Sequence, residues 1–263
     1  MHLLRTIGKD GAVPETWTPL LVGIVIVGVF IYGFSKTAIP VAGVFAGPLL
    51  AAALGATTAS GLMVPLLILG DLFALAHYRQ HADWRLIRKL VPGVLAGFAI
   101  TALLFAFLPV EVLGRIIGVL ILASLMLELF RRWGDRDGGE LQPMKSWGGI
   151  AFFGTLAGMT TMAANAGGTA MTLYLVKMRV SMLAFMGTSA WFFFILNLVK
   201  VPIVAGLGFM DSQTLIASLW LSPFIVLGAL VGVFTFRRMN ERVFTYVALG
   251  LSGVTAVWLV IHG

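Results

Sequence analysis

Residues 33–43 read GFSKTAIPVAG, and residues 158–169 read GMTTMAANAGGT. Each stretch interrupts a long apolar run with glycines and short polar side chains, and the first also contains a proline. A helix break exposes backbone polar groups, which a membrane tolerates only where protein buries them or water reaches them. The sequence therefore predicts two broken or re-entrant helices, near residues 33–43 and 158–169.

The apolar runs around these stretches are long. Hydrophobic residues make up 59% of the 263 positions and charged residues only 11%, whereas a soluble domain carries about a quarter charged residues. A run of roughly 18 or more apolar residues can cross ~30 Å of hydrocarbon. We therefore expect an all-α, polytopic transmembrane helix bundle, with segments at 17–35, 38–54, 58–76, 88–108, 112–130, 147–161, 166–176, 182–205, 213–236 and 243–261.

The two halves of the chain resemble each other. Similar residues recur in the same order, at offsets that grow from 125 to 131: Gly33 with Gly158, Gly43 with Gly168, Asp71 with Asn197, Pro92 with Pro223 and Gly97 with Gly228. An ordered series of this kind indicates an internal duplication. We expect an N-terminal tail (1–16), a first repeat (17–130), a cytoplasmic linker (131–146) and a second repeat (147–263).

The charges orient these repeats. The net charge is +7, and the basic residues gather in short loops near 79–89 and 237–242 and where the linker begins. The positive-inside rule places these loops in the cytoplasm, and anionic lipid headgroups explain the charge better than nucleic acid does. With about five segments per repeat, an odd number, the second repeat must be inverted relative to the first, and both termini lie outside.

The chemistry of the two breaks suits an anion. A half-helix that begins near Pro40 or Gly168 would direct free N–H groups and the positive end of its dipole into a cavity. The alternative is a lipid-type turn in which glycines serve helix packing and Lys36 extends to the headgroups. The candidate substrate-binding residues are Ser35, Lys36, Thr37, Pro40, Thr160, Thr161, Asn165, Gly167, Gly168 and Thr169.

Few other polar residues fall within the apolar runs. Asp71, Asn197 and Lys200 are candidates for coupling or for supporting the pocket, because charges in membrane helices usually face a partner or water. Alternatively, Asp71 and Lys200 lie near helix ends and reach the headgroups. His77 and His81 lie in a basic loop, where solvated histidines are commoner than metal ligands. We expect no metal and no cofactor, and the chain has no cysteine.

Three longer motifs resemble those of the TauE/SafE family, the sulfite-exporter or TSUP transporters. They are DLFALAHYRQHADW at 71–84; NAGGT at 165–169 followed by LYL at 173–175; and FMGTSAWFFF at 185–194 followed by Asn197, Lys200 and Pro202. Their order and spacing match the family over nearly the whole chain. The chain departs from the family pattern at residues 36–40 and at Thr169.

This resemblance implies a bacterial inner-membrane transporter that exports a small sulfur-containing or organic anion, such as sulfite, sulfoacetate or a related sulfonate. Alternating access driven by membrane potential, protons or both would fit a chain without a nucleotide-binding motif. An anion channel is the main alternative. An intramembrane enzyme is disfavoured, because the apolar runs hold no nucleophile–base pair and no metal cluster. Small residues on helix surfaces are compatible with a homodimer, without fixing the number of subunits.

Overall fold

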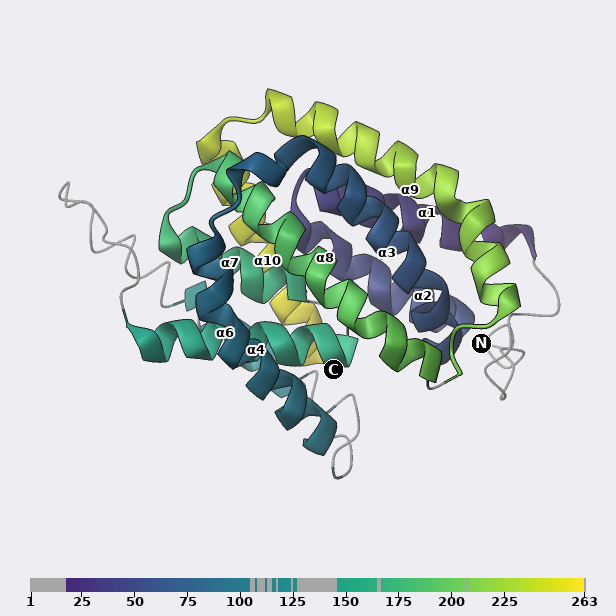
Figure 1. Ribbon diagram of the computed structural model, residues 1–263, viewed down its shortest axis with the longest axis horizontal. Helices are drawn as coiled ribbons and strands as arrows, with labels where there is room; N and C mark the ends of the chain where they lie inside the picture. Colours follow the sequence, from purple (N-terminus) through teal and green to yellow (C-terminus); the bar gives the residue numbers. More distant parts are fainter. Residues whose placement is uncertain are drawn as a thin grey trace. The chain divides into compact units, whose positions relative to one another are not determined.

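The computed structural model describes residues 18–104, 107, 112, 115–116, 118–123, 125–126, 146–164, 167–206 and 208–262. The expected N-terminal tail, part of the segment at 112–130 and nearly all of the linker at 131–146 lie outside these residues. All regular secondary structure in the described part is helical, as expected. The elements (Figure 1) are α1 (Pro19–Thr37), η2 (Pro40–Phe45), α2 (Ala46–Leu54), α3 (Ala56–Tyr78), η3 (Arg79–His81), α4 (Trp84–Leu104), α6 (Trp147–Ala164), α7 (Gly167–Met178), α8 (Met182–Gly206), α9 (Ser212–Arg238) and α10 (Glu241–His262).

Four of the described helical stretches are long and apolar enough to cross a membrane: Pro19–Thr37, Thr58–His81, Met182–Gly206 and Ser212–Arg238. By contrast, α2 and α7 have 9 and 12 residues. Both are too short to cross ~30 Å of hydrocarbon alone at 1.5 Å per residue. Each short helix directly follows one of the expected breaks.

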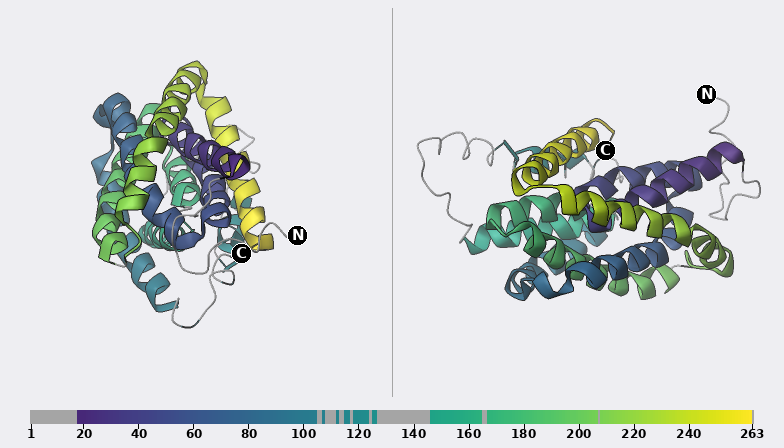
Figure 2. Two further views of the ribbon diagram at one scale, coloured as in Figure 1. Left: turned by 90° about the vertical axis from the view of Figure 1, so that its right-hand side faces the viewer. Right: turned by 90° about the horizontal axis from the view of Figure 1, so that it is seen from above.

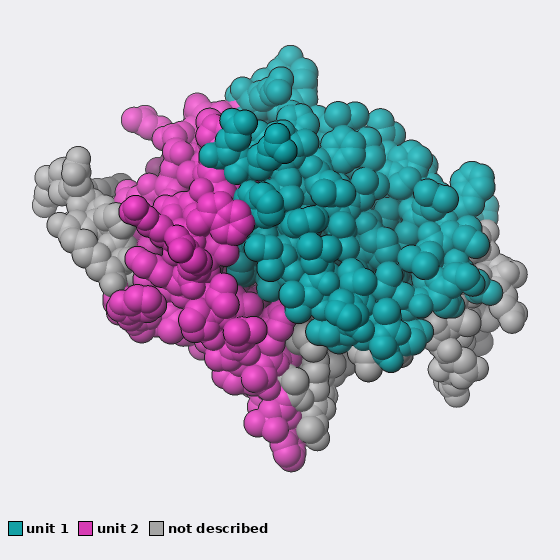
Figure 3. Space-filling view, in the orientation of Figure 1, with its two compact units in different colours: residues 1–80, 189–238 teal, residues 81–188, 239–263 magenta. Residues whose placement is uncertain are grey.

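The chain forms two compact units (Figure 3). Unit 1 comprises residues 1–80 and 189–238, and unit 2 comprises residues 81–188 and 239–263. Each unit therefore combines elements from both of the expected sequence repeats. In unit 1, α1, α2, α3 and α9 enclose an apolar core whose fully buried members include Val25, Val29, Leu50, Leu62 and Ile225.

In unit 1, α1 and α9 pack side by side (Figure 2) with their backbones in direct contact. A Cβ atom added at Gly33 would overlap the carbonyl oxygen of Ile225, and one added at Gly228 would overlap the carbonyl oxygen of Phe30. Small residues at such crossings let membrane helices approach closely enough for van der Waals packing to hold them together. Gly33 and Gly228 therefore serve this crossing.

Unit 2 contains a second crossing of the same kind, between α4 and α6. Here a Cβ atom at Gly158 would overlap the carbonyl oxygen of Val94, and one at Gly97 would overlap the carbonyl oxygen of Thr155. These helices also carry Gly93 and Gly154, each of which faces the other's backbone.

The two crossings correspond residue by residue under the offsets read from the sequence. Adding 125 to the α1 residues of the first crossing gives the α6 residues of the second (33 + 125 = 158 and 30 + 125 = 155). Subtracting 131 from the α9 residues gives the α4 residues (228 − 131 = 97 and 225 − 131 = 94). The same glycine-to-carbonyl approaches therefore occur once in each unit. Each pairs the first segment of one sequence repeat with the fourth segment of the other.

These crossings predict opposite effects for two glycine substitutions in α1. Gly33→Ala should lower the free energy of unfolding by about 1–3 kcal/mol, because the added methyl forces the backbones of α1 and α9 apart. Gly23→Ala is the matched control, since nothing lies within 4 Å of a Cβ atom there. It should be neutral or stabilising by up to about 1 kcal/mol, because alanine favours the helix. Reversible unfolding of the purified protein in detergent measures both, and equal stability of the two variants would contradict the close crossing.

Candidate functional site

The first break is shorter than the sequence suggested. Helix α1 continues through Gly33, Ser35 and Lys36 and ends at Thr37, so only Ala38 and Ile39 separate it from η2. The break falls here because Pro40 lacks an N–H and forces its predecessor into an extended conformation, as the φ and ψ angles of Ile39 show (−142° and 102°). Gly33, the first residue of the expected range 33–43, stays helical because α9 packs against it, so the break occupies only part of that range.

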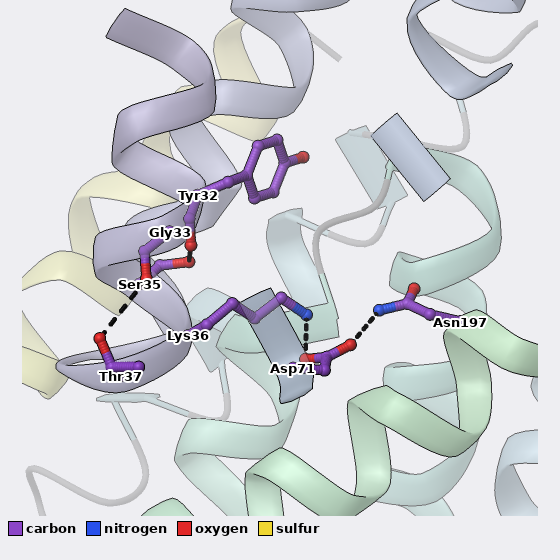
Figure 4. Close-up of polar contacts among 7 residues, drawn as sticks. All are labelled: Tyr32, Gly33, Ser35, Lys36, Thr37, Asp71 and Asn197. Carbon is purple, nitrogen blue, oxygen red and sulfur yellow. Dashed lines mark hydrogen bonds and ion pairs between the residues drawn. The ribbon is translucent and has the colours of Figure 1, made fainter. Parts of the chain in front are cut away.

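The end of α1 is fixed in place by hydrogen bonds, and Figure 4 shows those that lie within the helix. The Thr37 hydroxyl donates to the carbonyl of Ala229 on α9 (2.7 Å), and the Tyr78 hydroxyl donates to the carbonyl of Thr37 (2.9 Å). The Ser35 hydroxyl donates to the carbonyl of Tyr32 (2.8 Å) within α1. In this structure the donors of Ser35 and Thr37 thus stabilise the break. Pro40 is buried immediately beyond it.

Lys36 extends from the last turn of α1 to Asp71 on α3. Its Nζ lies 2.7 Å from Oδ1 of Asp71, and the two side chains are 10% and 0% exposed. Gly70 makes room for the lysine stem, because a Cβ atom there would lie 3.1 Å from Cγ of Lys36. The lysine therefore points into unit 1 and pairs with a buried carboxylate.

Asn197 on α8 completes the surroundings of this carboxylate. Its Nδ2 donates to Oδ2 of Asp71 at 2.6 Å, so Lys36 and Asn197 each contact one carboxylate oxygen (Figure 4). Asp71 is residue 14 (71 − 58 + 1) of the 24-residue candidate span Thr58–His81. This position and its full burial show that Asp71 is a residue of the protein interior, which excludes the alternative that it reaches the headgroups.

Lys200 adds a second cation on the same side of α8. It follows Asn197 by three residues, a spacing that puts both side chains on one helix face, and it is 8% exposed. It lies close enough to Asp71 and Lys36 to interact electrostatically with both. The ring of Phe193, also on α8, lies 5.0 Å from Nζ of Lys36. We call Lys36, Asp71, Asn197 and Lys200 the charged cluster; its formal charge is +1.

The second expected break falls in unit 2, where α6 is described to Ala164 and α7 from Gly167. Asn165 falls outside the described residues. Thr160 donates its hydroxyl to the carbonyls of Leu156 (2.8 Å) and Ala157 (3.1 Å) within α6. Four further candidates are buried there: Thr161, Gly167, Gly168 and Thr169.

Thr169 and Thr172 form a pair of buried hydroxyls in the first turns of α7. Both side chains are fully buried, and neither hydroxyl has a hydrogen-bond partner among the described residues. Their spacing of three residues places them on one face of the helix. The sequence analysis missed Thr172, although its distance from Thr169 would have revealed it. It also missed Gly70 and Phe193, whose roles depend on contacts between helices.

These features define a class of protein. The described helices include several potential membrane spans, and the charged cluster lies next to a helix break. Intramembrane charges of this kind mark substrate or ion pathways in transport proteins. Within the described residues, no group of three or more His, Cys, Asp or Glu side chains is arranged to hold a metal ion.

The model of the family described as "Sulfite exporter TauE/SafE" matches residues 13–259, and the chain belongs to this family. It is therefore a multi-pass membrane protein, and family membership suggests a transporter of sulfite- or sulfonate-type anions rather than an enzyme. The resemblance seen in the sequence is confirmed. No curated protein and no solved structure matched the chain.

The ion pair of the charged cluster predicts strong coupling in a double-mutant cycle. Lys36→Met and Asp71→Asn should each destabilise the protein, because each removes one partner of a buried pair, a change that can cost about 3–5 kcal/mol. Their combined effect should differ from the sum by about 0.5–3 kcal/mol. Thermal or denaturant unfolding in detergent measures the cycle.

Lys177 provides the control for this cycle. It is a buried lysine of unit 2 that lies over the ring of Phe153 at 5.5 Å, much as Lys36 lies over Phe193. Lys177→Met combined with Asp71→Asn should be additive within about 0.5 kcal/mol. Additivity of the Lys36 and Asp71 substitutions would contradict the ion pair.

Proposed function

We propose that this protein is a secondary transporter that exports a small sulfur-containing or organic anion, such as sulfite, sulfoacetate or a related sulfonate, across the bacterial inner membrane. The observation that carries the proposal is the charged cluster beside the first helix break. Two lysines and one carboxylate give it a formal charge of +1 in an apolar environment. A monovalent anion would neutralise this excess.

Lys36 is the proposed anion ligand. It lies in the last helical turn before the break, and its ammonium group has three N–H donors, so it can contact an anion oxygen by a small rotation away from Asp71. Phe193 beside it offers an apolar surface to an organic substituent. Ser35, Thr37 and Pro40 would then shape the break rather than donate to the anion, since both hydroxyl donors are already used.

The second break, within unit 2, is proposed as an anion-binding element of its own. Thr169 and Thr172 have hydroxyls without partners among the described residues, and the first N–H groups of α7, including those of Gly167 and Gly168, lie at the positive end of its helix dipole. Thr161 is a further candidate on α6. We assign Thr160 a supporting role, because its hydroxyl donates within its own helix.

We infer that the two sequence repeats are inverted and that they alternate the access of the bound anion. The matched glycine crossings of the two units support an internal duplication. So does the contact between Asp71 and Asn197, which occupy equivalent positions 126 residues apart (197 − 71). Outward movement of one negative charge gains about 2.3 kcal/mol per 100 mV when the inside is negative. A monoanion can therefore leave the cell on membrane potential alone.

A channel is the alternative function, and it shares the same anion-binding logic. Labelled-anion counterflow separates the two, because only a carrier exchanges external label for internal anion with saturation.

A homodimer and bound anionic lipids also fit a basic membrane protein; both are proposals that native mass spectrometry can address.

Flux from proteoliposomes tests the proposed function. Vesicles are loaded with sulfite or sulfoacetate, and efflux is followed under an imposed potential. Lys36→Ala should reduce efflux about tenfold or more, because a hydrogen bond to a charged group contributes about 1.5–3 kcal/mol. Lys89→Ala is the control, since this exposed lysine of α4 lies 6.0 Å from the ring of Trp147, in the other unit. It should leave efflux unchanged.

Two outcomes would count against the proposal in different ways. Undiminished efflux in Lys36→Ala would remove Lys36 from the anion site while leaving the transport function intact. The absence of efflux for every small sulfonate and carboxylate tried, with wild-type protein correctly folded in the vesicles, would overturn the function itself.

A further inference from the structure

Lys200 and Lys36 both lie near the buried carboxylate of Asp71. Asp71 is fully buried, with Lys36 at 2.7 Å and Asn197 at 2.6 Å. Lys200 stands on the Asn197 face of α8, close enough to interact electrostatically with the same carboxylate. Two largely buried cations therefore lie near one fully buried carboxylate.

An anion bound to Lys36 would weaken or break the ion pair with Asp71. A buried carboxylate without a cationic partner is strongly unfavourable, and such a group commonly takes up a proton instead. With Lys36 as its only cationic neighbour, Asp71 would therefore bind one proton for each anion bound. Lys200 provides the other solution, since it can hold the ionised carboxylate while Lys36 holds the anion.

We propose that Lys200 is the residue that keeps transport independent of protons, by serving as the counter-ion of Asp71 whenever Lys36 binds the anion. The inference rests on the proposed transport function and specifies how it is driven. The site then accepts a monoanion, and each turnover moves one net negative charge and no proton.

The other charged groups on the described α-helices of unit 1 do not alter this assignment. By sequence, η2 and α2 contain no ionisable side chain. Helix α1 carries Lys36 and the buried Tyr32, and the one ionisable side chain of α8 is Lys200. The charges of α9 are Arg237 and Arg238 at its end, and His77 lies at the end of α3, where its Nδ1 hydrogen-bonds with the carbonyl of Phe73. The charged cluster thus contains the charges within the helices that pack around Asp71.

The test is the equilibrium accumulation of radiolabelled methanesulfonate, a permanent monoanion, in proteoliposomes. Potential is set with potassium and valinomycin, and the pH gradient is set independently. Wild-type protein should accumulate the label about tenfold for each ~59 mV, as expected for one charge, and should not respond to a pH gradient. Lys200→Gln should respond in the opposite way. A pH gradient of one unit should give about tenfold accumulation, because one proton then accompanies each anion, and an imposed potential should give no accumulation.

Three further variants separate this role from a merely structural one. Lys200→Arg keeps a positive charge and should behave as wild type. The double variant Lys200→Gln with Asp71→Asn removes the carboxylate that would need the proton, so potential should again drive accumulation. Lys177→Gln, the buried lysine of unit 2, should keep the wild-type response.

Either of two results would overturn the proposal: wild-type accumulation that follows the pH gradient, or Lys200→Gln that keeps the wild-type response to potential. The wild-type measurement decides even if Lys200→Gln fails to fold. Methanesulfonate counterflow without any gradient distinguishes the two proposals. If counterflow occurs but accumulation follows the wrong gradient, only the role of Lys200 is overturned. If none of methanesulfonate, sulfite and sulfoacetate shows counterflow, the transport function is overturned as well.

Discussion

The ion pair between Lys36 and Asp71 constrains the surrounding structure, because neither charge is stable in an apolar interior without the other. Asp71 is fully buried and sits near the middle of a candidate membrane span. The end of α1 must therefore reach α3 at that depth, and Thr37, anchored to Ala229, holds it there. Gly70 leaves space for the lysine stem. The helix break thus lies beside the carboxylate that its last turn must meet.

Close glycine crossings provide the rigid frame for this pair. Gly33 lies three residues before Lys36, so the contact of α1 with α9 fixes the helical turn that carries the lysine. The equivalent contact of Gly158 with α4 lies just before Thr160 and Thr161 in unit 2. Each break therefore follows a tightly packed helix. Yet only the first repeat carries a lysine at this position, since 36 + 125 = 161 is a threonine.

The sequence predicted the helices and the locations of the breaks closely, because apolar run length and proline placement are local properties. It singled out Asp71, Asn197 and Lys200 because their positions recur between the repeats or carry charge in an apolar run. It did not predict that Lys36 pairs with Asp71, since that contact depends on how α1 and α3 pack. It also could not show that Gly33, at the edge of the expected break, stays helical. A glycine looks the same in sequence whether it ends a helix or admits a neighbouring backbone, and here α9 decides.

The central claim is that an anion contacts the Lys36 ammonium. Solid-state NMR of the reconstituted protein tests it most directly, by measuring the dipolar coupling between ¹⁵Nζ-labelled lysine and ¹³C-labelled sulfoacetate, with Lys36 assigned by its loss in Lys36→Arg. We predict that bound sulfoacetate couples to Lys36 and weakens the coupling of Lys36 to the ¹³Cγ carboxyl of Asp71. The contrary result would be obtained in vesicles that transport sulfoacetate: at saturating sulfoacetate, the Lys36–Asp71 coupling stays unchanged and no coupling to Lys36 appears. That result would contradict the proposed contact.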